Sequence, residues 1–101
     1  MMFIYTTCEN EKEVEKIAAA LLRARLGGCT NWWPIRGFYV WKGRAEKVRE
    51  VALLLKTHER HFKAVEKIIK KLHSYDVPCI VGWKIDKVNK NFGSWVKSSV
   101  K

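Results

Sequence analysis

The stretch from Cys29 to Thr57, CTNWWPIRGFYVW followed by KG and RAEKVREVALLLKT, decides the fold of this chain. Its two arms alternate apolar, aromatic and β-branched residues around Lys42-Gly43, a dipeptide that indicates a tight hairpin turn. Each arm is about 13 residues long and reaches ~43 Å at ~3.3 Å per residue. A globular chain of this length has a radius of gyration near ~13 Å. The pattern therefore predicts a hairpin that projects beyond its own domain.

The projecting hairpin would leave apolar strand edges in water. Such edges promote aggregation unless another surface covers them. Identical partners provide the simplest cover, so the sequence predicts a closed homo-oligomer. Four aromatic residues of the first arm are the expected contacts between subunits: Trp33, Phe38, Tyr39 and Trp41.

Length and composition indicate one folded domain, which we expect to span residues 1–101. Hydrophobic residues make up 48% of the chain and charged residues 30%, a balance typical of globular proteins rather than disordered ones. No apolar run approaches the ~20 residues of a membrane helix. The start, MMFIYTT, also lacks the basic segment of a signal peptide. We therefore expect a cytoplasmic protein without membrane contacts.

The number of cysteines and the net charge limit the kinds of site and partner that this chain can have. Cys8, Cys29 and Cys79 are widely spaced and odd in number, which argues against a disulfide framework or a zinc ribbon. The net charge of +10, with Trp32 and Trp41 set among basic residues, raises the alternative of a basic nucleic-acid-binding module. The charges are spread rather than clustered, however. We favour a solvated basic surface and do not expect a nucleic acid partner.

Five further elements are expected outside the hairpin. They are a strand over residues 2–7, a helix between Asn10 and Gly27, a helix over residues 59–72, a strand over residues 79–85 and a helix over residues 91–100. Asn10 and Glu13 have the spacing of a capping box, and Gly27-Gly28 is the expected helix stop. Thr57 is the expected cap of the second helix.

The order β-α-β-β-α-β with a C-terminal helix is the split βαβ, or ferredoxin-like, pattern of the α+β class. Right-handed crossovers place the four strands in one antiparallel sheet with both long helices on one face. Pro34 and Gly37 are expected to interrupt the pairing of the first hairpin arm, as an edge position or a bulge would.

Several motifs carry a family resemblance. They are YTT at Tyr5–Thr7, LGGCTN at Leu26–Asn31, FYVWKG at Phe38–Gly43, LLKT at Leu54–Thr57, LHSYDVPCI at Leu72–Ile80 and NFGSW at Asn91–Trp95. In this order and spacing the chain resembles the CutA divalent-cation-tolerance family from about Phe3 to Trp95. The resemblance implies a ferredoxin-like homotrimer, packed through its long hairpins, that binds metal ions such as copper. It implies no enzyme activity and no obligatory cofactor, and the chain contains no G-x-S-x-G, P-loop or H-E-x-x-H motif.

The metal ligands described for the family fit this chain only in part. A ligand cysteine in the first strand falls on Tyr5, and of the family's ligand histidines only His73 remains. The topology indicates another set, because Cys8, His73 and Cys79 should converge at one end of the sheet. Two thiols and an imidazole suit a soft or borderline ion such as Cu(I) or Zn(II). The alternative is that both cysteines fill small gaps and His73 is a cation at a helix C-terminus.

The opposite end of the sheet offers weaker candidates. Cys29, His58 and His61 fall there, and we expect solvated histidines rather than a second metal site. Cys29, Lys56 and Tyr75 are candidates to line a cleft between subunits. The alternative function is therefore a small-ligand or anion-sensing signalling trimer, by analogy of fold.

Overall fold

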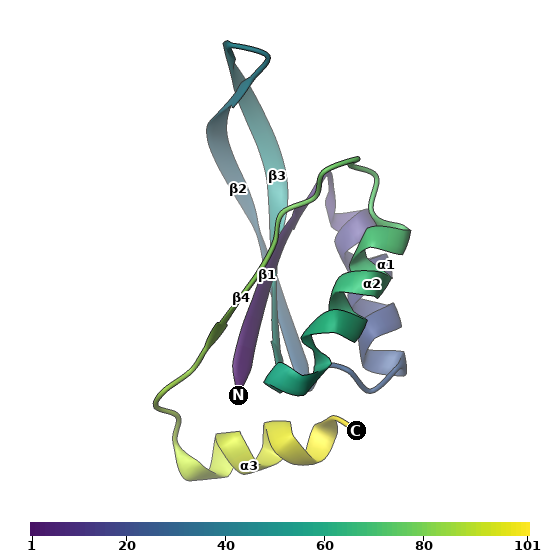
Figure 1. Cartoon of the computed structure of the whole chain (residues 1–101), viewed down its shortest axis with the longest axis vertical. Helices are drawn as coiled ribbons and strands as arrows, with labels where there is room; N and C mark the ends of the chain where they lie inside the picture. The colour runs from purple at the N-terminus through teal and green to yellow at the C-terminus, as the bar shows by residue number, and fades with distance from the viewer.

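The computed structural model covers residues 1–101 and contains one antiparallel four-stranded sheet in the order β2-β3-β1-β4. The strands are β1 (Met2–Cys8), β2 (Cys29–Trp41), β3 (Arg44–Thr57) and β4 (Ile80–Lys84). The helices are α1 (Glu11–Arg23), α2 (Phe62–Leu72) and α3 (Lys90–Ser99), with the 3-10 turn η1 (Glu59–His61) before α2. Helices α1 and α2 cover one face of the sheet, and α3 crosses the end away from the hairpin tip (Figure 1). The predicted α+β, ferredoxin-like topology is confirmed.

The hairpin has the predicted limits and turn. Lys42 and Gly43 have φ angles of 52° and 77°, and a tight turn with both central residues at positive φ matches the twist of the flanking strands. Strand β1 pairs with β3 only from Val51 to Thr57, whereas β2 pairs with β3 along its whole length. Residues 44–50 therefore project past the sheet by about 23 Å, at ~3.3 Å per residue. The projection stretches the molecule to 45 × 26 × 21 Å.

Pro34 and Gly37 do not interrupt the ladder. Pro34 lies opposite Val51 and Gly37 opposite Val48, in a register that runs without a break from Cys29 onward. The expected interruption is wrong, but the edge position is confirmed, because β2 is the outer strand of the sheet. An edge strand accommodates proline because the missing N–H can lie on the side without a partner strand.

The end of α1 differs from the prediction. Helix α1 ends at Arg23, and Arg25 rather than a glycine has the left-handed conformation, with φ of 58°. The Leu26 amide donates to the Leu21 carbonyl and the Arg25 amide to the Leu22 carbonyl, each at 3.0 Å, which is the Schellman pattern. Gly27 has another role, since a Cβ there would lie 2.2 Å from Leu55 Cδ1.

The expected cap of the second helix is also wrong. The Thr57 hydroxyl donates to the Leu26 carbonyl at 2.5 Å and so ties the end of β3 to the loop after α1. The chain then passes through η1, whose N-cap position is His58, before α2 begins at Phe62. The predicted end of α2 at Leu72 is confirmed.

The core lies between the two long helices and the sheet. Its members come from alternate positions of β1 and β3, from the inner faces of both helices and, with Leu26, from the loop after α1: Ile4, Cys8, Val14, Ile17, Ala18, Leu21, Leu26, Leu53, Leu55, Val65 and Ile69. The same alternation leaves the other face of the sheet without a covering layer. No helix of the structure has the length and apolar character needed to cross a membrane.

Leu21 and Leu22 provide a matched test of this core. Leu21 is 0% exposed and Leu22 is 43% exposed, although they are neighbours on α1. We expect Leu21→Ala to lower the free energy of unfolding by about 2–5 kcal/mol because it leaves a cavity. The control Leu22→Ala should change it by about 0.5 kcal/mol. Urea denaturation at fixed protein concentration measures both values, and equal losses would contradict this core assignment.

Candidate metal centre

Three different donor groups meet at the end of the sheet where β1 finishes. They are the Cys8 thiol of β1, the Glu13 carboxylate of α1 and the His73 imidazole after α2, and their ligand atoms all lie within 4.8 Å of one another. The predicted convergence of Cys8 and His73 is present. The third member of this cluster is Glu13, which the sequence analysis recognised only as a helix-capping residue.

The start of α1 brings Glu13 to this position. The Asn10 side chain accepts a hydrogen bond from the Glu13 amide at 2.9 Å, and Glu13 Oε1 accepts one from the Glu9 amide at 3.2 Å. This variant of the capping box, in which the carboxylate bonds to the residue before the N-cap, turns the Glu13 carboxylate back toward the end of β1. Its other oxygen accepts a hydrogen bond from the Ser74 amide at 3.0 Å, which ties α1 to the turn after α2.

His73 is oriented by two backbone groups. Its Nε2 lies 2.8 Å from the Thr7 carbonyl oxygen, and its Nδ1 accepts a hydrogen bond from the Tyr75 amide at 3.1 Å. An amide can only donate, so the ring proton is on Nε2 and donates to Thr7. The Nδ1 lone pair is thus occupied by the Tyr75 amide, and Nδ1 lies at the edge of the cluster, 3.8 Å from Glu13 Oε1.

The pKa values of Cys8 and Glu13 are shifted in opposite directions. Burial and the nearby Glu13 carboxylate raise the pKa of the Cys8 thiol to about 12. Burial opposes ionisation of Glu13, but hydrogen bonds from Ser74 and Glu9 and the nearby His73 outweigh it and lower the pKa of Glu13. At neutral pH the cluster therefore holds a protonated thiol beside an ionised carboxylate.

The donor set fits a borderline metal ion. Sulfur, nitrogen and oxygen ligands bind Zn²⁺ at ~2.0–2.3 Å, so ligand atoms within 4.8 Å can reach one ion after small movements. The Cys8 and His73 side chains are fully buried, and the Glu13 side chain is 12% exposed. A surface hollow of about 210 Å³ gives access to Glu13 between Asn10, Lys12, Lys16 and Leu72.

Cys79 is not a member of this cluster. It is exposed, and its pKa is raised by burial of part of the thiol and by the charge of Glu50. Ile80 pairs with Thr6, so Cys79 lies opposite Thr7. Successive side chains of a strand point to opposite faces of the sheet, so Thr7 and Cys8 lie on different faces. This parity places the two thiols on opposite faces of the sheet. Burial and, to a smaller extent, the nearby Cys79 raise the pKa of Tyr5, a residue of the open face.

The three cleft candidates divide between the two ends of the sheet. Lys56 Nζ lies 3.7 Å from Cys29 Sγ and contacts the Asn31 side chain. Tyr75 lies at the other end, where its hydroxyl donates to Glu50 at 2.8 Å. A cleft that contains all three residues would have to be formed by more than one subunit.

The histidines near the end of β3 are less exposed than expected. His61 is buried, and its Nε2 contacts the carbonyl oxygen of Lys101, which also accepts a hydrogen bond from Arg60 Nη2 at 2.7 Å. His58 is half-buried, and its Nδ1 is inaccessible to solvent and has no hydrogen-bond partner. The prediction of solvated histidines is therefore wrong. No local sequence signal marks this burial, because it depends on how α3 packs against the end of the sheet.

Comparisons with known proteins agree with this architecture. The model of the CutA1 divalent ion tolerance protein family matches residues 2–99. The divalent-cation tolerance protein CutA of Archaeoglobus fulgidus is 38% identical over 98 residues, which cover 97% of this chain and 96% of that protein. The protein of the same name from Pyrococcus horikoshii is 38% identical over 100% of this chain and 99% of its own length.

Solved structures give the same result. The structure described as the periplasmic divalent cation tolerance protein CutA from Archaeoglobus fulgidus superposes with a TM-score of 0.97 at 37% identity, and each chain is covered completely. The crystal structure of CutA1 from Pyrococcus horikoshii has a TM-score of 0.95 at 37% identity and covers 100% of this chain and 99% of that one. Full-length similarity in both sequence and fold shows that this chain belongs to the CutA1 divalent ion tolerance protein family.

Proposed function

We propose that this protein binds metal ions such as copper, without catalysing a reaction, as a homotrimer in the cytoplasm. The observation that carries the metal-binding role is the meeting of a thiol, a carboxylate and an imidazole within 4.8 Å. The names of the relatives support it, because they are divalent-cation tolerance proteins. The three free cysteines suit a reducing compartment, although the solved Archaeoglobus relative is described as periplasmic.

The proposed ligands are Cys8 Sγ, a Glu13 carboxylate oxygen and His73 Nδ1. The His73 Nε2–H bond to Thr7 holds the ring in place, and Nδ1 binds the ion by giving up its hydrogen bond from the Tyr75 amide. The mixed donor set favours Zn²⁺ or copper over Mg²⁺ and Ca²⁺, which prefer oxygen ligands. Cys79 remains a predicted ligand that requires movement of the chain before β4.

The first test is calorimetric titration of the reduced protein with Zn²⁺, and with Cu(I) under anaerobic conditions. We expect Cys8→Ser, Glu13→Gln and His73→Gln each to weaken binding by at least ~10–100-fold, because each removes a ligand. Cys29→Ser is the matched control, since Cys29 lies at the other end of the sheet and should leave affinity unchanged. Cys79→Ser decides whether that thiol is a fourth ligand.

Two outcomes would contradict the proposed site. In one, the Cys8→Ser and His73→Gln proteins bind with wild-type affinity. In the other, Cys29→Ser weakens binding as strongly as Cys8→Ser. Thermal denaturation of each variant without metal separates loss of a ligand from loss of the fold.

Proton release provides a second test. Because the pKa of Cys8 is raised to about 12, the thiol carries its proton at neutral pH and must lose it when it binds an ion as thiolate. Affinity should therefore increase about tenfold per pH unit around neutrality. Titrations in buffers of different ionisation enthalpy should show one more proton released by the wild type than by Cys8→Ser. The same proton count in both proteins would exclude Cys8 as a ligand.

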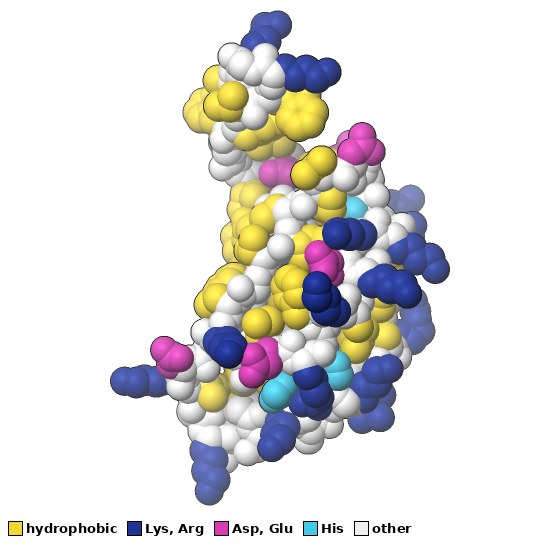
Figure 2. All heavy atoms as spheres, in the orientation of Figure 1, with side chains coloured by type: hydrophobic (Ala, Val, Ile, Leu, Met, Phe, Trp, Pro, Cys, Tyr) yellow, Lys and Arg dark blue, Asp and Glu magenta, His cyan; other side chains and the backbone are white.

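The homotrimer is supported by the surface of the hairpin and the open face of the sheet. Phe38 is 78% and Trp41 54% exposed, and Trp33 and Tyr39 are also exposed. Figure 2 shows apolar side chains along the hairpin and down the sheet side of the molecule, while lysines and arginines lie over the helices and at the hairpin tip. Monomeric proteins rarely expose a contiguous apolar surface of this kind.

Native mass spectrometry tests the trimer and its contacts. We expect a mass of three chains for the wild type and dissociation at micromolar concentration for the double variant Tyr39→Ser/Trp41→Ser, because buried aromatic anchors dominate interface energies. Trp95→Ser is the control, since Trp95 is equally exposed but belongs to α3. A wild-type monomer, or a trimer unaffected by the double variant, would refute the proposed interface.

A further inference from the structure

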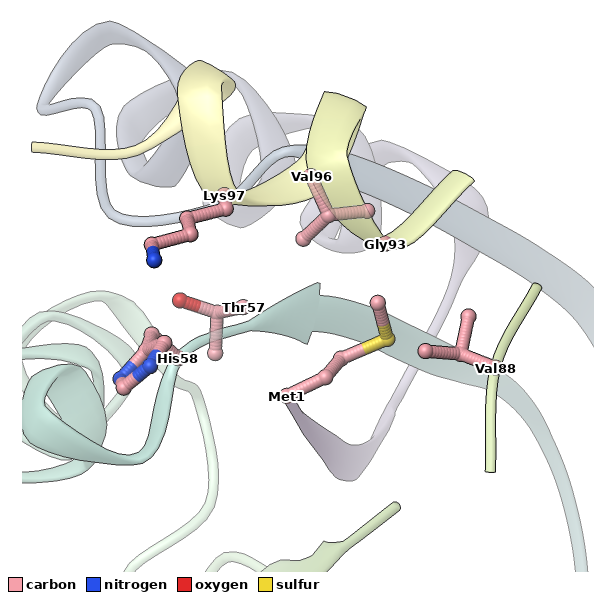
Figure 3. A pocket seen from close by; sticks show the side chains of 7 residues that line it. All are labelled: Met1, Thr57, His58, Val88, Gly93, Val96 and Lys97. Carbon is pink, nitrogen blue, oxygen red and sulfur yellow. The ribbon is translucent and has the colours of Figure 1, made fainter. Parts of the chain in front are cut away.

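A second cavity lies at the end of the sheet opposite to the metal cluster. It has a volume of about 240 Å³, is open to solvent on one side, and lies between the chain start, the segment after β3 and helix α3. Figure 3 shows that its lining has two halves. Lys97, Thr57 and His58 surround one end, and Met1, Val88 and Val96 surround the other.

The polar half holds an unused hydrogen-bonding group. His58 Nδ1 is buried and has no partner within the protein. The Thr57 hydroxyl beside it is buried and donates to the Leu26 carbonyl. Lys97, from α3, directs its ammonium group toward Thr57 and His58 (Figure 3). A buried nitrogen without a partner costs free energy, so a ligand that bonds to it would bind favourably there.

The charges around the cavity indicate the charge of its ligand. Burial and the nearby Arg60 lower the pKa of His58, so the imidazole is neutral at neutral pH and can carry its proton on Nδ1. Lys97 lines the cavity, and Glu59, the acidic residue next to His58, is paired with Lys84 at 3.1 Å. No acidic side chain lines the cavity. The polar half therefore suits an anion.

The apolar half of the cavity limits the size and polarity of the uncharged part of the ligand. Val96 is buried, and Val88 packs so closely on Gly93 that a Cβ at that position would lie 3.1 Å from Val88 Cγ1. An inorganic anion would leave these side chains without a contact. The volume is also below the ~300 Å³ at which drug-sized ligands begin to fit, which excludes a nucleotide.

We propose that this cavity binds a small monocarboxylate with a short branched apolar tail. The carboxylate accepts a hydrogen bond from Lys97 Nζ and, once the His58 ring has rotated to bring its buried Nδ1 to the cavity surface, a second one from that nitrogen. The tail contacts Met1, Val88 and Val96. Charge-assisted hydrogen bonds of this kind are stronger than neutral ones, so the carboxylate should decide affinity and the tail should decide selectivity. The site shares no residue with the metal cluster and does not depend on the proposed metal function.

Amide NMR titration of the full-length protein with isovalerate tests the proposal, in the presence of EDTA so that metal binding plays no part. We expect saturable shifts of the Thr57, His58, Gly93 and Lys97 amides. Isoamyl alcohol has the same tail without the charge and should bind at least about tenfold more weakly. Acetate has the charge without the tail and should also bind more weakly, because it buries less apolar surface.

Two variants distinguish the halves of the cavity. Lys97→Met should weaken isovalerate binding about tenfold and leave isoamyl alcohol unaffected. The matched control Lys90→Met removes the same charge from an exposed position of α3 outside the cavity, and isovalerate affinity should not change. Val88→Ser should weaken isovalerate binding several-fold and acetate binding hardly at all.

The proposal is overturned if isovalerate gives no saturable shift in the wild type, or if isoamyl alcohol binds as tightly as isovalerate. It is also overturned if Lys90→Met and Lys97→Met weaken binding equally, because the effect would then be general electrostatic attraction to a basic protein. The comparison of the three probes on the wild type decides the question even if a variant fails to fold.

Discussion

The continuous pairing of β3 with β2 is the constraint on which the rest of the structure depends. From Val51 to Thr57, β3 lies between β2 and β1, and its inward side chains pack under the helices. From Arg44 to Glu50 the same strand has β2 as its only neighbour and projects from the domain. A slip of one residue would turn Leu53 and Leu55 out of the core and would reverse the faces of the projecting tip. One register therefore sets both the core and the surface offered to other subunits.

The hairpin was predictable because its signals are local and agree with one another. Alternation specifies the two faces, and Lys42-Gly43 supplies the positive φ angles of the turn. The end of α1 was not predictable in this way. Its two following glycines suggest that a glycine has the left-handed conformation, but Arg25 has it instead. The decisive contact is tertiary. Burial of Leu26 beside Leu21 fixes where the Schellman turn falls, and the sequence alone does not show that Leu26 is buried.

The candidate metal cluster was predictable to the extent that topology determines it. Strand and helix directions bring the ends of β1 and α2 together, and so Cys8 and His73 meet. Glu13 was overlooked because its capping role already explained it, although a capping box at the start of α1 also returns the carboxylate to the end of β1. The position of Cys79 needed the register of β4 on β1, since that register decides which face of the sheet its thiol occupies.

A chain with a net charge of +10 can still offer a site to a cation, because local charges act within a Debye length of ~8–10 Å and distant ones are screened. Three carboxylates gather where β1 ends: Glu9 and Glu13 from the start of α1 and Glu50 from β3. Burial raises the pKa values of the Cys8 thiol and the Tyr75 hydroxyl there, and the negative charges of these carboxylates raise them further. At the other end of β1, Lys97 and Arg60 lie around His58, and no carboxylate lines the cavity there. The two ends of one short strand thus favour ligands of opposite charge, and the net charge of the chain describes neither.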